Sequence, residues 1–146
     1  MDTKTISEGE FAGWHTWPGE PFEHDTAGPF YMRQDTDGDM VAAFRAERKH
    51  MNAGGVVHGG ALMTFADFAL FALAHSGDDD GYGVTVAFTS EFLAGALEGE
   101  QVEARGAVMG GGKSVTFDRG VITSDGRPVL TFSGTIKKRH KKVDSK

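Results

Sequence analysis

The chain has 146 residues, enough for a single domain over residues 1–146 whose core needs no covalent staples. It contains no cysteine, which excludes a disulfide framework, a thiolate zinc site and a cysteine nucleophile. The net charge is −6, and residues 1–136 hold nine basic and 20 acidic residues, a balance of −11 that argues against a broad nucleic-acid-binding face.

The two ends of the chain differ in composition. Residues 1–8 are polar and acidic, unlike a secretory signal, so we expect a cytoplasmic protein. Residues 1–28 scatter aromatic side chains among Pro and Gly, which predicts an irregular arm pinned to the core. Six of the 15 Lys and Arg lie in the last ten residues. Residues 138–146 therefore predict a basic, disordered tail, with contact to a phosphate-bearing ligand as the alternative.

Two strands are predicted next, over residues 30–33 and 40–46, joined by an Asp-rich turn that contains an Asp-Gly pair. A calcium loop of the EF-hand type would need its glycine later than Gly38. This spacing argues against calcium.

Residues 52–60 carry four glycines and lead directly into the apolar run 61–74. We expect a helix from about residue 60 to residue 75, ended by the acidic turn 78–81, because carboxylates are unfavourable at a helix C-terminus. The apolar run is shorter than the roughly 20 residues needed to span a bilayer. It therefore predicts a core helix, and no membrane partner is expected.

One carboxylate, Asp67, interrupts this apolar run. Removing an ionised carboxylate from water costs several kcal/mol unless it is paired or hydrogen-bonded. Carboxylates in such places cluster at catalytic sites, where they serve as bases or nucleophiles. The structural alternative is an Asp that points to solvent or caps a neighbouring loop.

After residue 83 the apolar period changes from helical to two, which indicates strands. Short turns between them imply antiparallel pairing. The pattern predicts an α+β fold in which one curved antiparallel sheet wraps around one long central helix. The four strands expected here cover residues 84–89, 101–108, 113–123 and 128–137.

Other motifs are weaker. The sequence of residues 110–114 resembles the end of a phosphate-binding P-loop, but Ala107 stands where its first glycine belongs and a strand follows, so a hairpin turn is expected. Among six histidines only His58 lies in a context that suggests chemistry, and no pair has metal-ligand spacing. We expect no metal. The absence of a Gly-x-Ser-x-Gly elbow argues against a serine triad.

Taken together, Asn52, the triplet His58-Gly59-Gly60, Asp67 and Thr85 resemble, at these separations, the hotdog-fold acyl-CoA thioesterases of the phenylacetate-degradation (PaaI-like) type. The similarity covers most of the chain. It implies the hotdog fold, hydrolysis of an acyl-CoA or aryl-CoA thioester, and a homodimer or homotetramer with active sites between subunits. No cofactor is expected, since CoA is part of the substrate.

The resemblance also assigns roles. The Gly59 N–H would stabilise the oxyanion at the start of the helix, and Asp67 would act as general base or as nucleophile. Asn52 and His58 would orient the carbonyl-binding loop and the water, and the Thr85 hydroxyl would position that water. Asp67 and Thr85 would face Asn52 and Gly59 of the partner subunit.

Contacts with CoA are expected from a second set of residues: Gly60, Gly111, Gly112, Lys113 and Ser114. A basic patch for the phosphates is predicted around Lys113, with Arg105 or Arg119 and the tail from Lys137 as further members.

Two other functions remain open at this stage. A hotdog hydratase or dehydratase also uses a histidine with an acid, but its histidine loop is built differently and would leave Asn52 and the glycines of residues 59–60 unexplained. A non-catalytic acyl-CoA-binding module is the other alternative, and the presence of Asp67 argues against it.

Overall fold

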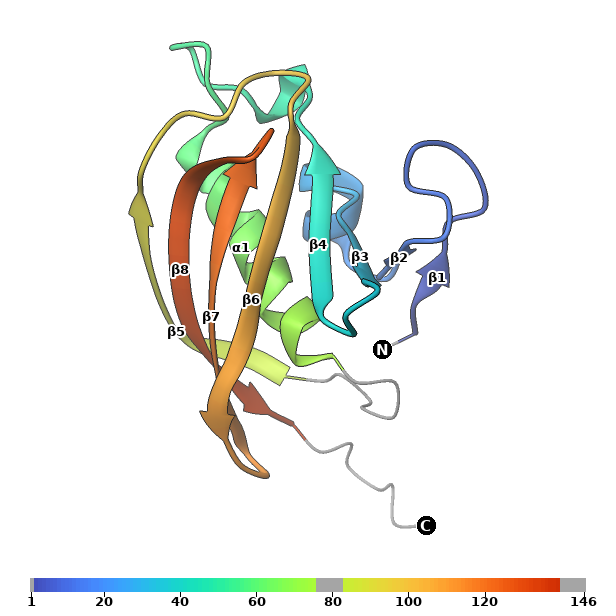
Figure 1. The fold of residues 1–146 in the computed structure, drawn as a ribbon, viewed down its shortest axis with the longest axis vertical. Coiled ribbons are helices and arrows are strands. Elements are labelled where there is room, and N and C mark those ends of the chain that lie inside the picture. The colour runs from blue at the N-terminus through green and yellow to red at the C-terminus, as the bar shows by residue number, and fades with distance from the viewer. Residues whose placement is uncertain (1, 76–82, 140–146) are drawn as a thin grey trace.

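The computed structural model describes residues 2–75 and 83–139, and in them an eight-stranded antiparallel sheet curls around one long α-helix (Figure 1). The hotdog architecture expected from the sequence is confirmed. The helix is α1 (Gly59–Ala74), accompanied by a π-helical segment η1 (Pro21–Ala27) and a 3₁₀ turn η2 (Arg48–His50). The strands are β1 (Lys4–Thr5), β2 (His15–Thr16), β3 (Tyr31–Gln34), β4 (Met40–Arg45), β5 (Gly83–Phe92), β6 (Gln101–Gly111), β7 (Val115–Ser124) and β8 (Arg127–Lys138).

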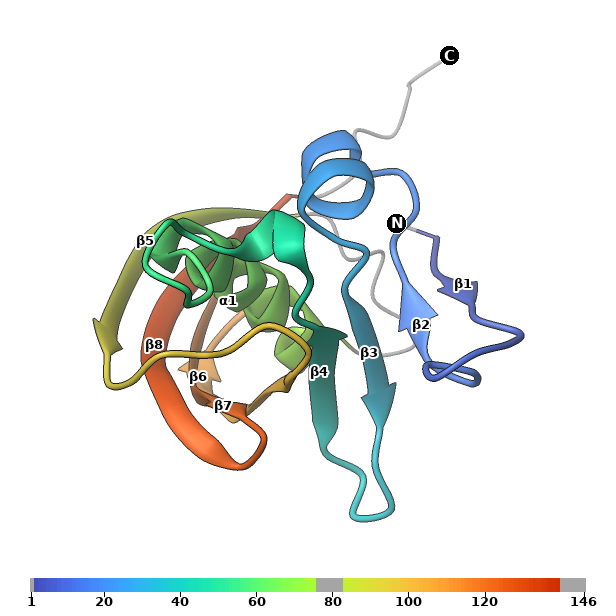
Figure 2. The ribbon, with the colours of Figure 1, turned by 90° about the horizontal axis from the view of Figure 1, so that it is seen from above.

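The strand order is β1-β2-β3-β4-β6-β7-β8-β5, so β6, β7 and β8 separate β5 from β4, the strand that precedes it in the chain. Seen from above, β4, β6, β7, β8 and β5 form the curved wall around the helix (Figure 2). Strand β5 forms one edge of the sheet and pairs with β8, which places Thr85 opposite Ile136. Through its pairing with β8, β5 lies beside α1, the helix that precedes it in the chain.

The first 28 residues are more regular than the sequence predicted. Two short strands extend the sheet, with Lys4 paired to Thr16 and His15 paired to Met32. Residues 21–27 form η1, which packs against α1. Strands of two residues are too short to show an alternating pattern in the sequence, so only their backbone pairing in the structure reveals them.

Helix α1 begins and ends within one residue of its predicted bounds. Its Ala, Leu and Met residues favour helix, and most of its apolar side chains, the Phe rings included, are buried. Leu70 approaches β8 where that strand has Gly134; a Cβ at this position would lie 2.4 Å from Leu70 Cδ1. The glycine therefore lets the helix pack closely against the sheet.

An aromatic cluster joins the N-terminal residues to the helix. Phe30, Phe44 and Phe65 contact one another with ring centroids 4.8–5.2 Å apart. Trp17 packs against Phe68 at 5.1 Å. Such tilted and edge-on pairs add to the energy of burial. The cluster holds the chain before β3 firmly against α1.

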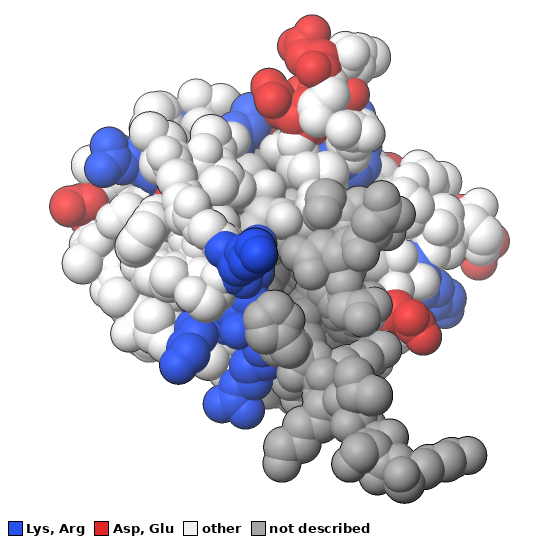
Figure 3. Space-filling model, turned by 90° about the horizontal axis from the view of Figure 1, so that it is seen from below, with Lys and Arg blue, Asp and Glu red and all other residues white. Residues whose placement is uncertain are grey.

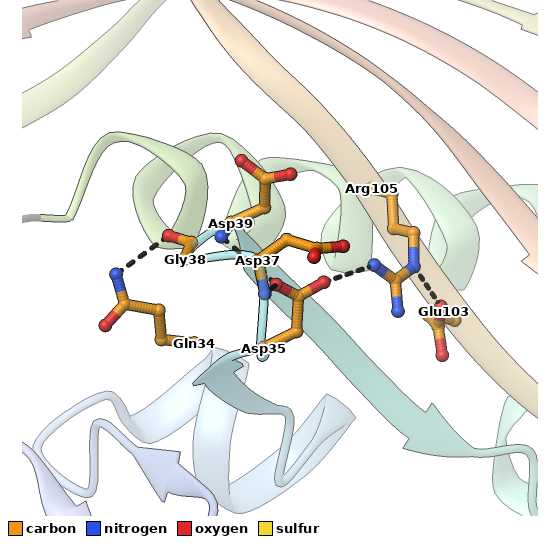
Figure 4. Close-up of polar contacts among 7 residues, drawn as sticks. All are labelled: Gln34, Asp35, Asp37, Gly38, Asp39, Glu103 and Arg105. Atoms are coloured by element: carbon orange, nitrogen blue, oxygen red, sulfur yellow. Dashed lines mark hydrogen bonds and ion pairs between the residues drawn. The ribbon is translucent and has the colours of Figure 1, made fainter.

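The Asp-rich turn between β3 and β4 is held by hydrogen bonds and ion pairs (Figure 4). The Asp35 carboxylate accepts the N–H groups of Asp37 and Asp39 and pairs with Arg105 Nη1 at 2.8 Å. Arg105 also binds Glu103 through Nε at 2.6 Å. The Arg105 guanidinium holds the pKa of Asp35 below its ordinary value. Arg105 thus anchors this turn and is engaged by two carboxylates.

Two predicted features lie outside the described residues: the acidic turn 78–81 and residues 140–146 of the basic tail. Lys138 is described and ends β8, so the predicted tail starts inside a strand. No helix in the described part of the chain is long and apolar enough to cross a membrane.

Asp118 is an unusual core residue. It lies on β7 with 2% of its surface exposed, and neither carboxylate oxygen has a hydrogen-bond partner among the described residues. Burial raises its pKa from 3.8 to about 6, although Lys138 acts in the opposite direction. The folded protein therefore holds this proton more tightly than the unfolded chain does.

We expect Asp118→Asn to stabilise the protein above pH 6. Between about pH 4 and pH 6 the folded state binds more protons than the unfolded state, so rising pH lowers the free energy of unfolding, by about 3 kcal/mol for a shift of this size. Asp118→Asn has no carboxyl group to ionise at this position, so its free energy of unfolding does not fall in this way. Urea unfolding at pH 8 should favour the variant, and the difference should shrink at pH 4. Equal stabilities at pH 8 would contradict the prediction.

Candidate active site

The glycine-rich loop before α1 is built around its own side chains. Asn52 Oδ1 accepts the N–H groups of Gly54 and Val56 at 2.9 and 3.2 Å, which closes a tight turn. His58 caps the helix, its Nδ1 accepting the Gly60 N–H at 2.8 Å. Asn52 and His58 thereby shape the loop and the helix start, and neither contacts Asp67.

The Gly59 N–H is the first amide of the helix, and no acceptor for it is found among the described residues. Such amides at a helix N-terminus bind anionic oxygens. The Phe92 ring lies so close that a Cβ on residue 59 would sit 3.1 Å from it. Glycine here lets the Phe92 ring lie close to the helix start and leaves the backbone accessible.

Beside this helix start lies a groove of about 380 Å³. His58, Gly60 and Thr64 line it from α1 and its cap, and Phe22 and Lys49 line the opposite side. The exposed ring of Phe22 comes from η1. The groove thus runs between the N-terminal arm and the helix.

Asp67 lies two turns further along α1. Its Oδ1 accepts a hydrogen bond of 2.6 Å from the Thr85 hydroxyl on β5. Both side chains are half-buried, so Asp67 is less buried than its apolar neighbours suggested. The bond joins two residues that the sequence paired only through resemblance, and it fixes the orientation of the carboxylate.

Asp67 and Thr85 line a cavity of about 340 Å³. Phe71 and Val84 form apolar wall, and the N-terminal arm adds Trp17, Glu20 and Glu23. Burial raises the pKa of Glu23 from 4.5 to about 8, and the negative charges of Glu20 and Asp67 act in the same direction. Glu23, whose carboxyl group keeps its proton at neutral pH, therefore shares one cavity with Asp67 and the Thr85 hydroxyl.

One chain does not bring all the predicted catalytic residues together. Gly59 and Asp67 are eight residues apart on a straight helix, about 12 Å along its axis. An amide and a carboxylate at that separation are too far apart to contact one thioester carbonyl. The candidate site in a single subunit is thus divided into an amide end and a carboxylate end.

The predicted CoA-binding turn lies at the opposite end of the sheet from the start of α1 (Figure 1). Gly111 still belongs to β6, and the connection to β7 consists of Gly112, Lys113 and Ser114. Position 111 requires glycine, because its φ is +134° and a Cβ there would collide with Val115 O. The turn is therefore shorter than expected and is set by glycine geometry.

Basic side chains gather at this end of the molecule (Figure 3). Lys113 is exposed in the turn, and the Lys138 N–H donates to Ser114 O at 2.8 Å, which places the end of β8 beside it. Lys137 is in register with Val84, which lines the cavity of Asp67. We define Lys113, Lys137, Lys138 and Arg139 as the basic end; Arg105 does not belong to it, because Asp35 and Glu103 engage it elsewhere.

Sequence reasoning missed the contribution of the arm. Nothing in the spacing of Trp17, Glu20 and Glu23 relates them to a helix 40 residues later. In the sequence, only the aromatic residues of the arm indicated a contact with the core, and they were interpreted as anchors. Within residues 2–75 and 83–139, no three His, Asp or Glu side chains are grouped to hold a metal ion.

The chain was compared with known proteins. A model of the thioesterase superfamily matches residues 54–131, which include the amide end, Asp67, Thr85 and the turn before β7. A presumed esterase of Pseudomonas aeruginosa is 37% identical over 113 residues, covering 77% of this chain and 84% of that protein.

Solved structures share the fold. The PaaI protein of the E. coli phenylacetic acid degradation operon has a TM-score of 0.65 and 24% identity, with 80% of this chain and 87% of that chain covered. A hypothetical thioesterase from Streptococcus pneumoniae, crystallised with coenzyme A, has a TM-score of 0.69 and 22% identity, with 82% and 95% covered. At these identities the likeness shows the fold.

Proposed function

Because this chain belongs to the thioesterase superfamily, we propose that it hydrolyses an acyl-CoA or aryl-CoA thioester to a free acid and CoA. The hydrogen bond between Thr85 and Asp67 carries the proposal. It holds a half-buried carboxylate at the wall of a cavity large enough for a small acyl group, as a base or nucleophile requires. A cytoplasmic location stays a prediction from the sequence.

In the proposed reaction Asp67 acts on the thioester carbonyl carbon by one of two routes. As general base it takes a proton from water, whose oxygen attacks the carbon. As nucleophile it bonds to that carbon while the carbon–sulfur bond breaks and the thiolate leaves, and water then cleaves the resulting mixed anhydride. In both routes negative charge develops on the carbonyl oxygen, where an unpaired amide such as that of Gly59 stabilises it.

The amide comes from a second copy of the chain in this proposal. The separation of Gly59 from Asp67 along α1 supports a site shared by two subunits. Strand β5 has ten residues and, among the described residues, pairs only with β8, so its other edge is open. Phe92 at the end of β5, and Leu93 and Leu97 after it, are about half exposed. An unpaired edge with apolar neighbours favours pairing with another chain. We propose a homodimer, or a homotetramer built from two dimers.

CoA is proposed as the carrier of the acyl group. The Streptococcus pneumoniae structure contains coenzyme A, and a Streptococcus mutans protein of the same fold was crystallised with acetyl CoA. In this chain the basic end supplies positive charge that phosphates require, despite the acidic balance of the rest. We propose that residues 111–114 of one subunit and Gly60 of the other contact this carrier, because the two lie at opposite ends of a single chain's sheet (Figure 1).

A panel of acyl-CoA and aryl-CoA thioesters, assayed for release of free thiol, tests the proposal. We expect stoichiometric thiol and acid from at least one member. Conversion of an enoyl thioester to a hydroxyacyl thioester without thiol release would contradict it and support a hydratase.

Asp67→Asn should cut kcat at least about a hundredfold, the usual cost of losing a general base. The fold should persist, because the amide has the shape of the carboxylate, and removal of a half-buried charge favours stability. Turnover and circular dichroism of the same preparation check this. Near-normal turnover would exclude Asp67 from the mechanism.

Thr85→Ala should lower kcat about tenfold, since a hydrogen bond to a charged group contributes about 1.5 kcal/mol or more. Thr85→Ser retains the donor and should stay close to the wild type. Both are measured on one saturating substrate beside Asp67→Asn. If the alanine variant keeps full kcat, the bond to Asp67 has no part in turnover.

Lys113→Glu should raise KM for a CoA thioester and leave kcat nearly unchanged, because the phosphates bind far from the carbonyl. Added salt should act in the same direction, since the Debye length is about 10 Å at 0.1 M. Lys4→Glu on β1 makes the same charge change at the other edge of the sheet and should have little effect.

A short thioester without the nucleotide is the control substrate, and its KM should change neither with Lys113→Glu nor with added salt. If KM for the CoA thioester is the same in Lys113→Glu as in Lys4→Glu, Lys113 does not meet the phosphates.

A further inference from the structure

Resting on the proposed hydrolysis, we propose that Glu23 is the general acid of this site and gives a proton to the sulfur that leaves the acyl group. The residue comes from the N-terminal arm, outside the region matched by the family model. Its carboxyl group lines the same cavity as Asp67 and Thr85, where the thioester would be cleaved.

The arm holds Glu23 in place from both sides. At the end of η1, His50 Nε2 bonds with Ala27 O at 2.7 Å, and Lys49 Nζ donates to the O atom of the next residue, Gly28. Before η1, Trp17 is buried against Phe68 on the turn of α1 that carries Asp67. The position of Glu23 over the cavity is therefore set by packed and hydrogen-bonded neighbours.

The surroundings of Glu23 favour its neutral form. Its side chain is partly buried and has no hydrogen-bond or ion-pair partner among the described residues, and none of the described residues that line the cavity is Lys or Arg. The charged groups that face it are Glu20 on the arm and Asp67 on α1, both negative. With a pKa near 8, the carboxyl group keeps its proton at pH 7.

The other titratable groups nearby have different contacts. His24 and Asp25, on the same helical turn, pair with each other at 2.7 Å. His75, at the end of α1, contacts the ring of Trp17. The Thr85 hydroxyl is uncharged and donates a hydrogen bond to Asp67. None of these supplies a cation to the cavity wall on which Glu23 lies.

The proton balance of the reaction follows. In the general-base route, Asp67 takes one proton from water as the water oxygen bonds to the carbonyl carbon. When the carbon–sulfur bond breaks, its electron pair stays on sulfur, which takes the Glu23 proton to give the thiol. Asp67 is then protonated and Glu23 ionised, and transfer of the proton within the shared cavity restores both. An acid with a pKa near 8 matches a thiol of pKa about 8.5.

The test compares two leaving groups on one acyl group: the N-acetylcysteamine thioester, which releases an alkyl thiol, and the thiophenyl ester, which releases a more acidic thiol. Glu23→Gln should lower kcat/KM about a hundredfold for the alkyl thioester and only slightly for the thiophenyl ester, because a stable thiolate needs no proton. Asp67→Asn should lose activity on both esters, since both need activated water.

The pH profile gives a second measurement. For the wild type, kcat on the alkyl thioester should fall above about pH 8 as Glu23 loses its proton, and Glu23→Gln should lack this fall. Glu20→Gln is the matched control, a neighbouring carboxyl on the same wall. It should keep the leaving-group pattern of the wild type and move the alkaline fall to lower pH, because the Glu20 charge raises the pKa of Glu23.

Equal losses on the two esters in Glu23→Gln, or full activity on the alkyl thioester, would overturn the role of Glu23. Both results leave the proposed hydrolysis intact if Asp67→Asn is inactive. Failure of the wild type to release thiol from either ester or from any CoA thioester would instead overturn the proposed function. Because each variant is compared with itself on two substrates, a general loss of folded protein cannot imitate the expected result.

Discussion

Burial of α1 inside the curved sheet is the constraint on which the rest of the structure depends. The helix is apolar on nearly every side, and each of its large side chains contributes roughly 1.5–3 kcal/mol when fully buried. A flat sheet would cover one face of it. The strands therefore curl around it, and Gly134 lets Leu70 pack against β8. A polar group on such a helix is tolerated only where the wall leaves a cavity, which is where Asp67 lies.

This placement links stability with chemistry. Strand β5 follows α1 in sequence but lies at the edge of the sheet beyond β8, and this crossing brings the Thr85 hydroxyl to 2.6 Å from the Asp67 carboxylate. The first amide of the same helix, that of Gly59, has no acceptor in the described part of the chain and lies about 12 Å away. A shared site between two copies resolves that separation. The open edge of β5 is consistent with such pairing.

Local patterns account for what the sequence predicted well. The change from a helical period to a period of two located α1 and the four strands after it, because side-chain direction along helices and strands follows from backbone geometry. The Asp-Gly turn located the two strands before the helix. The lone charge at Asp67 and the spacing from Asn52 to Thr85 pointed to candidate residues, since a carboxylate in an apolar helix needs a reason. The N-terminal arm escaped, because strands of two residues carry no period.

By itself, then, the sequence determined the single long helix, the antiparallel strands after it and the carboxylate that the helix carries, all features encoded by residues close together in the chain. Only the tertiary structure decided which hydroxyl reaches Asp67, that Arg105 binds Asp35 and Glu103, and that Glu23 lines the cavity. Glu23 and Asp67 lie 44 positions apart. Their proximity follows from aromatic packing and the hydrogen bond between His50 and Ala27, contacts that no local pattern specifies.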